Sequence, residues 1–177
     1  MNTVALIVGL IAAVLWLLSY QQKKRIAIIL FNATSRGLFI LQYILLGAFS
    51  GAILDVLGVL SSVVAGKKHV GFIKKHTRLL FVVINLATVL IGLFIAYANQ
   101  SWLDLFPIVG VTLQTSAFWL TSEKRIRWIS LIGTPFWFVY NFTSGAYGTA
   151  LCDILTICSI IIAMIKYRNM DAETENT

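Results

Sequence analysis

The chain has 177 residues, of which 59% are hydrophobic and only 12% are charged, and its formal net charge is +7. A soluble domain carries about twice that charged fraction, so the composition excludes an ordinary soluble core and predicts an all-α integral membrane protein. A membrane-spanning helix needs about 20 apolar residues, which leaves no room for a separate soluble domain.

Seven apolar segments follow one another along the chain, and we expect each to form a membrane-spanning helix. They are residues 3–20, 26–46, 48–65, 77–98, 103–121, 126–143 and 147–167. Strands of a membrane barrel would alternate at period two, and helices are the other structure that pairs every backbone polar group inside the bilayer. Because the first segment is followed rather than preceded by positive charges, we expect a retained helix and not a signal peptide.

Positive charges fall in alternate loops, and only one of the fourteen Lys and Arg residues lies outside them. The groups are Lys23, Lys24 and Arg25 after the first segment, Lys67, Lys68, Lys74, Lys75 and Arg78 after the third, Lys124, Arg125 and Arg127 after the fifth, and Lys166 and Arg168 at the last. The positive-inside rule predicts that the N-terminus is outside and the C-terminus is cytoplasmic. The positive charge is thus explained by topology, and nucleic acid is not an expected partner.

An internal repeat relates the two halves of the chain. Residues 47–55 (GAFSGAILD) and 145–153 (GAYGTALCD) share four of nine positions, and the Lys-Arg-Ile at 24–26 recurs at 124–126. Both copies have the same predicted orientation, so one extra helix must separate them. The sequence predicts two parallel three-helix repeats joined by a linker helix, a 3+1+3 arrangement. The predicted parts are 1–66 (first repeat), 67–98 (basic loop and linker helix), 99–167 (second repeat) and 168–177 (polar cytoplasmic tail).

Four short stretches carry a resemblance to a known family: QQKKR at 21–25, LQYILLGAFSGAILD at 41–55, TPFWFVYN at 134–141 and GAYG at 145–148. On these, the chain resembles the YgjV family of bacterial inner-membrane proteins over most of its length. That family is similar, more distantly, to the superfamily of SWEET and semiSWEET sugar carriers and PnuC vitamin transporters. The resemblance implies a small-solute carrier fold in the bacterial inner membrane. The chain lacks the Pro-Gln dipeptide of SWEET proteins, so a sugar substrate is not expected.

Polar and aromatic residues share one face of the second and sixth segments. Asn32, Arg36, Phe39 and Tyr43 are spaced for one helix face, and the repeat pairs them with Ser130, Thr134, Trp137 and Asn141. This spacing predicts that the two faces meet across a pseudo-twofold axis. These eight residues are candidates for binding a neutral or amphipathic small solute in a midplane cavity. The alternative is that they join neighbouring helices by hydrogen bonds.

Arg36 lies near the centre of its segment, where an arginine costs about 2.5–3.5 kcal/mol on insertion scales, so we expect it to face the bundle interior and find a partner. Asp55 is the nearest candidate, and Asp153 is its repeat counterpart. The pair could be structural, or part of a solute or proton pathway. Pro135 should kink the sixth segment and is a candidate hinge, although such a kink can serve shape alone.

The function predicted from these features is facilitated or gradient-driven transport of a small solute, since no ATP-binding motif is present. The alternative is a non-transporting structural, assembly or sensory protein of the inner membrane. We expect no enzymatic activity, because the chain has no HExxH or GxSxG motif, and we expect no metal or cofactor. The expected partners are the lipid bilayer and the solute, with homo-oligomer formation left open.

Overall fold

The computed structural model describes residues 3–47, 49–143 and 147–167, and this part of the chain forms eight α-helices and one 3₁₀ helix without any strand. The helices are α1 (Thr3–Tyr20), α2 (Arg25–Leu46), α3 (Phe49–Gly66), α4 (Gly71–Lys75), α5 (Thr77–Ala98), η1 (Trp102–Asp104), α6 (Leu105–Ala117), α7 (Glu123–Thr143) and α8 (Tyr147–Lys166). The all-helical class predicted from the sequence is confirmed. The first two residues of the repeat copy at 145–153, Gly145 and Ala146, and the predicted tail at 168–177 lie outside the described part.

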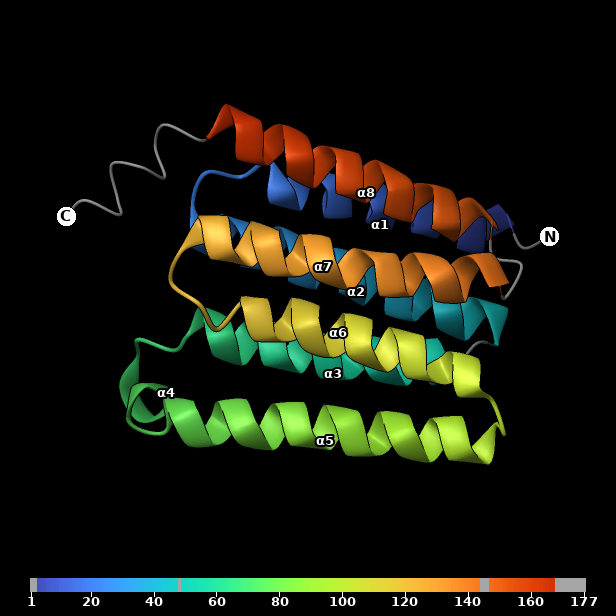
Figure 1. Ribbon diagram of the computed structural model, residues 1–177, viewed down its shortest axis with the longest axis horizontal. Helices are drawn as coiled ribbons and strands as arrows, with labels where there is room; N and C mark the ends of the chain where they lie inside the picture. The colour runs from blue at the N-terminus through green and yellow to red at the C-terminus, as the bar shows by residue number, and fades with distance from the viewer. Residues whose placement is uncertain (1–2, 48, 144–146, 168–177) are drawn as a thin grey trace.

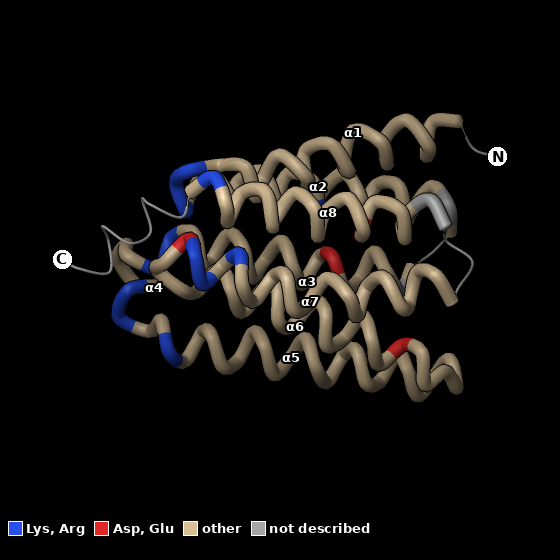
Figure 2. Tube along the Cα trace, turned by 45° about the horizontal axis from the view of Figure 1, so that its top comes forward, with Lys and Arg blue, Asp and Glu red and all other residues tan. Residues whose placement is uncertain are grey.

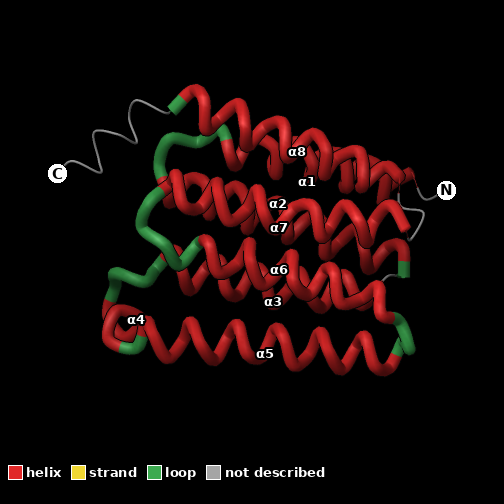
Figure 3. The backbone as a smooth tube through the Cα atoms, viewed as in Figure 1, coloured by secondary structure: helices red, strands yellow, loops and turns green. Residues whose placement is uncertain are grey.

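The long helices form two layers (Figure 1). One layer holds α1, α2 and α3 in order, and the other holds α6, α7 and α8. The layers touch where α1 meets α8 and where α3 meets α6, and α5 packs at one edge against α3 and α6. Short connections make consecutive helices antiparallel, as the path of the tube in Figure 3 shows. Because the outer helices of the two layers meet in this way, the middle helices α2 and α7 face each other across the bundle.

Within the described residues, four helices are long and apolar enough to cross a membrane: Thr3–Tyr20, Arg25–Leu45, Thr77–Ala98 and Thr149–Lys166. Gly51–Gly66 forms a shorter apolar helix. Only 17% of the apolar stretch in α5 is buried, so most of its leucine, valine and phenylalanine side chains point outward. An apolar surface of this extent needs lipid as its solvent.

The predicted segment 103–121 differs most from the structure. Residues Trp102–Asp104 form a 3₁₀ turn, and α6 ends at Ala117. Beyond Ala117 the chain turns, and its carbonyl groups accept hydrogen bonds from basic side chains instead of continuing the helix. Lys68 Nζ donates to Trp119 O at 2.5 Å, and Arg25 Nε donates to Leu120 O at 2.6 Å. The short helix α4, in the basic loop, was not predicted.

Basic residues gather at the end of the bundle that carries α4 (Figure 2). Two of them connect the layers. Arg25 of α2 donates from Nη2 to Phe118 O after α6, and Arg127 of α7 donates from Nη2 to Gln22 O after α1 at 2.9 Å. Arg127 is 1% exposed. Each guanidinium thus sits on the C-terminal carbonyls of a helix in the opposite layer, where the helix dipole favours a cation.

Lys68 shares this end of the bundle and is 7% exposed. Burial lowers the pKa of Lys68 to about 8, and the nearby positive charge of Arg25 lowers it in the same direction. Close packing of cations here is tolerated because each one has a carbonyl partner. We call this region, defined by Arg25, Lys68 and Arg127 with their carbonyl partners, the basic end.

Candidate functional site

A pocket lies between the two layers, and both contribute to it. Its lining residues are Ala13 and Trp16 of α1, Arg36, Phe39 and Tyr43 of α2, Asp55 of α3, Gln114 of α6, Trp137 and Asn141 of α7, and Thr149, Cys152, Asp153 and Thr156 of α8. We call it the interlayer pocket. The space open to the centres of water molecules is about 50 Å³. Because one water centre needs roughly 10–15 Å³, the pocket has room for about four water-sized groups.

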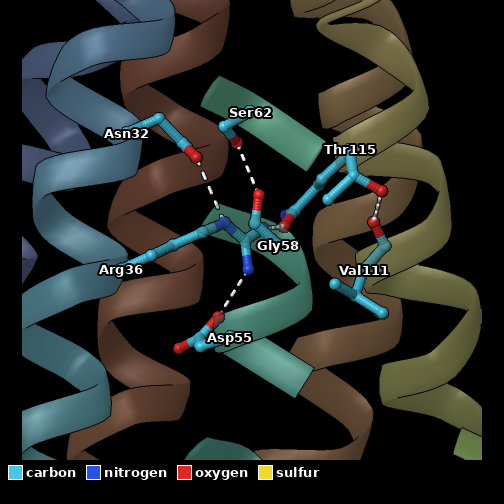
Figure 4. Close-up of polar contacts among 8 residues, drawn as sticks. Asn32, Arg36, Asp55, Gly58, Ser62, Val111 and Thr115 are labelled. Atoms are coloured by element: carbon cyan, nitrogen blue, oxygen red, sulfur yellow. Dashed lines mark hydrogen bonds and ion pairs between the residues drawn. The ribbon is translucent and has the colours of Figure 1, made fainter. Parts of the chain in front are cut away.

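Arg36 is the centre of the polar network beside this pocket (Figure 4). Its Nη1 donates to Asp55 Oδ1 at 2.5 Å, and Arg36 and Asp55 form a salt bridge whose side chains are 1% and 7% exposed. Its Nε donates to Asn32 Oδ1 at 3.2 Å, and its Nη2 donates to Gln114 Oε1 at 3.1 Å. The guanidinium therefore joins α2 to α3 and to α6. Since α6 belongs to the other layer, this network crosses between the layers.

The position of the guanidinium is also fixed by packing. Its Cζ lies 5.0 Å from the ring centroid of Trp16, a cation–π distance. On α3, Gly58 leaves the space that the guanidinium fills, because a Cβ there would lie 2.7 Å from Arg36 Nη1. Hydrogen bonds, an aromatic face and a glycine thus hold Arg36 in one place.

The second layer has a different polar arrangement at the matching positions. Asn141 Nδ2 donates to Asp153 Oδ2 at 2.8 Å. Thr134, the repeat counterpart of Arg36, donates from Oγ1 to Ser130 O at 2.8 Å and receives a long hydrogen bond of 3.4 Å from Gln114 Nε2. The carboxylate of Asp153 therefore has an amide partner where Asp55 has a guanidinium.

Most of the predicted site residues, from the polar faces and from the candidate ion pair, lie at the pocket. Seven of them line it: Arg36, Phe39, Tyr43, Asp55, Trp137, Asn141 and Asp153. Three others are buried beside it rather than in its lining: Asn32 bonds Arg36, and Ser130 and Thr134 lie at 0% and 1% exposure within α7. Pro135 does not line the pocket. The helix α7 continues past Pro135 and runs from Glu123 to Thr143.

Several lining residues were not among the predicted site residues. Ala13, Trp16, Gln114, Thr149, Cys152 and Thr156 come from α1, α6 and α8. The repeat contains a small part of this signal, because its offset of 98 residues in the later segments pairs Thr156 with Gly58, which packs on Arg36. The other five positions have no signal in the sequence, because only the docking of α1, α6 and α8 brings them to the pocket.

An all-helical bundle with an outward apolar surface, a basic end and a charged pocket at its centre defines a polytopic helical membrane protein. A family model described as "Bacterial inner membrane protein", Imp-YgjV, matches residues 3–171. The chain belongs to this family. No curated protein matches the chain, and no solved structure matches it.

Proposed function

We propose that the two layers are two copies of one three-helix unit and that α5 is the linker between them. In this arrangement α1, α2 and α3 correspond to α6, α7 and α8. The contacts support this correspondence, because α1 meets α8 while α6 meets α3, as a twofold axis parallel to the helices requires. With α4 outside the membrane, the chain then crosses seven times in a 3+1+3 order.

The orientation that we propose places the basic end in the cytoplasm and the N-terminus in the periplasm. Figure 2 supports this, since Lys and Arg cluster at one end of the bundle. The interlayer pocket begins at Arg36 and extends toward the other end, because Tyr43 and Thr149 lie close to the helix ends there. The protein is then closed at the cytoplasmic side and the pocket is nearer the periplasm.

The function that this arrangement supports best is carriage of a small neutral or amphipathic solute by rocking of the two layers around the pocket. The observation that carries the proposal is that α2 and α7, the matching helices of the two layers, both line one polar and aromatic pocket. Trp137 contributes its ring to this lining, while the edge that carries its buried Nε1 lies against Gly110 of α6. Transport is facilitated or gradient-driven and involves no covalent chemistry.

A non-transporting role is the second candidate, and one observation favours it. Arg36 satisfies its donors within the protein and links three helices, which is what a purely structural ion pair would do. Under this candidate the pocket is a packing defect, and the basic end serves as a docking surface for another membrane component or a second copy of the chain.

Solute uptake by purified protein in liposomes separates the two candidates. A panel of radiolabelled neutral, amphipathic and charged small solutes is compared with protein-free liposomes. Trp137→Ala is the pocket variant, and Trp102→Ala is the matched control because Trp102 is 69% exposed and does not line the pocket. We expect saturable uptake of at least one solute that is reduced by the first change only. Equal leakage with and without protein for the whole panel would refute transport.

A further inference from the structure

The charges that line the interlayer pocket do not cancel. Two aspartates and one arginine contribute to the lining. The arginine is committed to Asp55, and this is the salt bridge found in the described residues. Asp153 receives a hydrogen bond from the neutral amide of Asn141. One carboxylate therefore faces the pocket without a cation beside it within the described part of the chain.

Arg36 is paired with Asp55 rather than with Asp153. Its Nε, Nη1 and Nη2 donate to Asn32, Asp55 and Gln114, and its face lies against Trp16. Moving the guanidinium to Asp153 would leave Asp55, at 5% exposure, as an uncompensated buried charge. Such a loss is strongly destabilising, so Arg36 stays with Asp55, and an ionised Asp153 can be compensated by a bound cation from outside the protein.

Aromatic side chains surround the same space. Phe39, Tyr43 and Trp137 line the pocket together with Asp153. Aromatic faces attract alkylated ammonium groups, and they do so more strongly where water is excluded. One aromatic ring of the pocket already makes a cation–π contact, because the Cζ of Arg36 lies 5.0 Å from the ring centroid of Trp16. An anion would be repelled by the charge of Asp153.

We propose that the interlayer pocket binds a small organic cation, an ammonium with one or more methyl groups, with Asp153 as its counter-ion and Trp137, Tyr43 and Phe39 as its aromatic wall. This inference rests on the proposed function in one respect, because both place the solute in the interlayer pocket. Of the neutral or amphipathic solutes proposed there, it selects the amphipathic ones that carry a positive charge. The pocket space of about 50 Å³ fits a methylated ammonium headgroup, while a longer tail extends toward the periplasmic end.

Cys152 allows a direct binding test without any transport step. It lines the pocket, whereas Cys158 is exposed and lies outside it. In a Cys158→Ser protein, the rate of Cys152 modification by a small methanethiosulfonate is measured with choline or with 3,3-dimethyl-1-butanol, its uncharged carbon isostere. We expect choline to slow the reaction at a concentration at least tenfold lower than the isostere needs. Equal protection by both compounds, or protection by neither, would overturn a cation site.

Asp153→Asn tests the counter-ion, and Asp104→Asn is the matched control. Asp104 also accepts a hydrogen bond of 2.8 Å from an asparagine, Asn99, but it does not line the pocket. We expect the first change to raise the protecting choline concentration at least tenfold and the second to leave it unchanged. If Asp153→Asn does not fold, Asp153→Glu replaces it and should keep the preference for choline.

The binding and uptake results distinguish this inference from the proposed function. Protection by choline without any solute uptake would support the cation site and overturn transport. Uptake of a neutral solute, with choline giving no more protection than its isostere, would support transport and overturn the cation site.

Discussion

Gly58→Ala is expected to destabilise the protein by pushing Arg36 out of its network. A Cβ at this position would lie 2.7 Å from Nη1, 3.0 Å from Cζ and 3.1 Å from Cδ of Arg36. Carbon atoms in contact are normally about 3.5–4.0 Å apart, so the guanidinium must move by nearly an ångström. It cannot move freely, because Asp55 holds Nη1 at 2.5 Å and Gln114 holds Nη2 at 3.1 Å.

The size of the effect follows from two opposing terms. Replacing a helical glycine by alanine gains about 1 kcal/mol of helix propensity. Overpacking of a buried site costs about 1–3 kcal/mol, and the weakened buried ion pair adds to that cost. Gly37→Ala is the matched control, because a Cβ at Gly37 in α2 would meet no atom of the described residues within 4 Å. We expect Gly58→Ala to be about 2–4 kcal/mol less stable than Gly37→Ala.

The assay is unfolding of purified protein in mixed micelles with increasing SDS, followed by circular dichroism. The same two glycine changes are then measured in an Arg36→Met background, where the shorter, uncharged side chain can move aside. We expect the cost of Gly58→Ala to fall by at least 1 kcal/mol in that background, since coupled neighbours show interaction energies of about 0.5–3 kcal/mol. Equal stability of the Gly58 and Gly37 variants would refute the packing argument.

Three further predictions concern charge and close packing. Arg36→Asp combined with Asp55→Arg should be more stable in detergent than either single change, because each single change buries two like charges, and equal melting temperatures for all three would contradict direct pairing. The lowered pKa of Lys68, about 8 against 10.5, means that the unfolded chain binds more protons between about pH 8 and 10.5. The stability of the wild type relative to Lys68→Met should therefore rise with pH across that window, and a flat difference would refute this. Gly110→Ala should lower the melting temperature, because its Cβ would lie 2.6 Å from the ring of Trp137, and an unchanged value would argue against this close approach.

The class of fold and the inward direction of Arg36 could be predicted because each depends on local sequence. Long apolar segments must be helices in lipid, and a charge in the middle of one must face the interior. The ends of α1, α2 and α5 agree with the predicted segments to within a residue for the same reason. Asp55 was identified as the partner of Arg36 because few other charges lie at a similar depth.

The rest depended on how the helices dock, which no local pattern records. Gln114 reads as an isolated polar residue in α6, and only the packing of α6 against α3 brings it to Arg36. Arg25 and Arg127 count as loop charges in the sequence, yet their side chains turn back onto the carbonyls of opposite helices. The carbonyls just beyond α6, which ends earlier than its apolar composition predicts, accept hydrogen bonds from Arg25 and Lys68.

The difference between Arg36 and Thr134 shows the limit of the repeat as a guide. Symmetry predicts equal faces on α2 and α7, but one layer carries a guanidinium and the other a hydroxyl that donates within its own helix. The consequence is that Asp55 is paired with a cation and Asp153 is not. Residues from both polar faces line the interlayer pocket, and the difference at Arg36 and Thr134 leaves Asp153 with an amide partner.

Solute uptake after modification of one cysteine tests most directly whether the interlayer pocket is a transport pathway. A bulky thiol reagent is applied to two matched single-cysteine proteins in liposomes, Cys158→Ser, which retains Cys152 in the pocket, and Cys152→Ser, which retains the exposed Cys158. We predict that modification stops uptake in the first protein and leaves it unchanged in the second. Uptake that continues at its original rate after complete modification of Cys152 would contradict a transport pathway through this pocket.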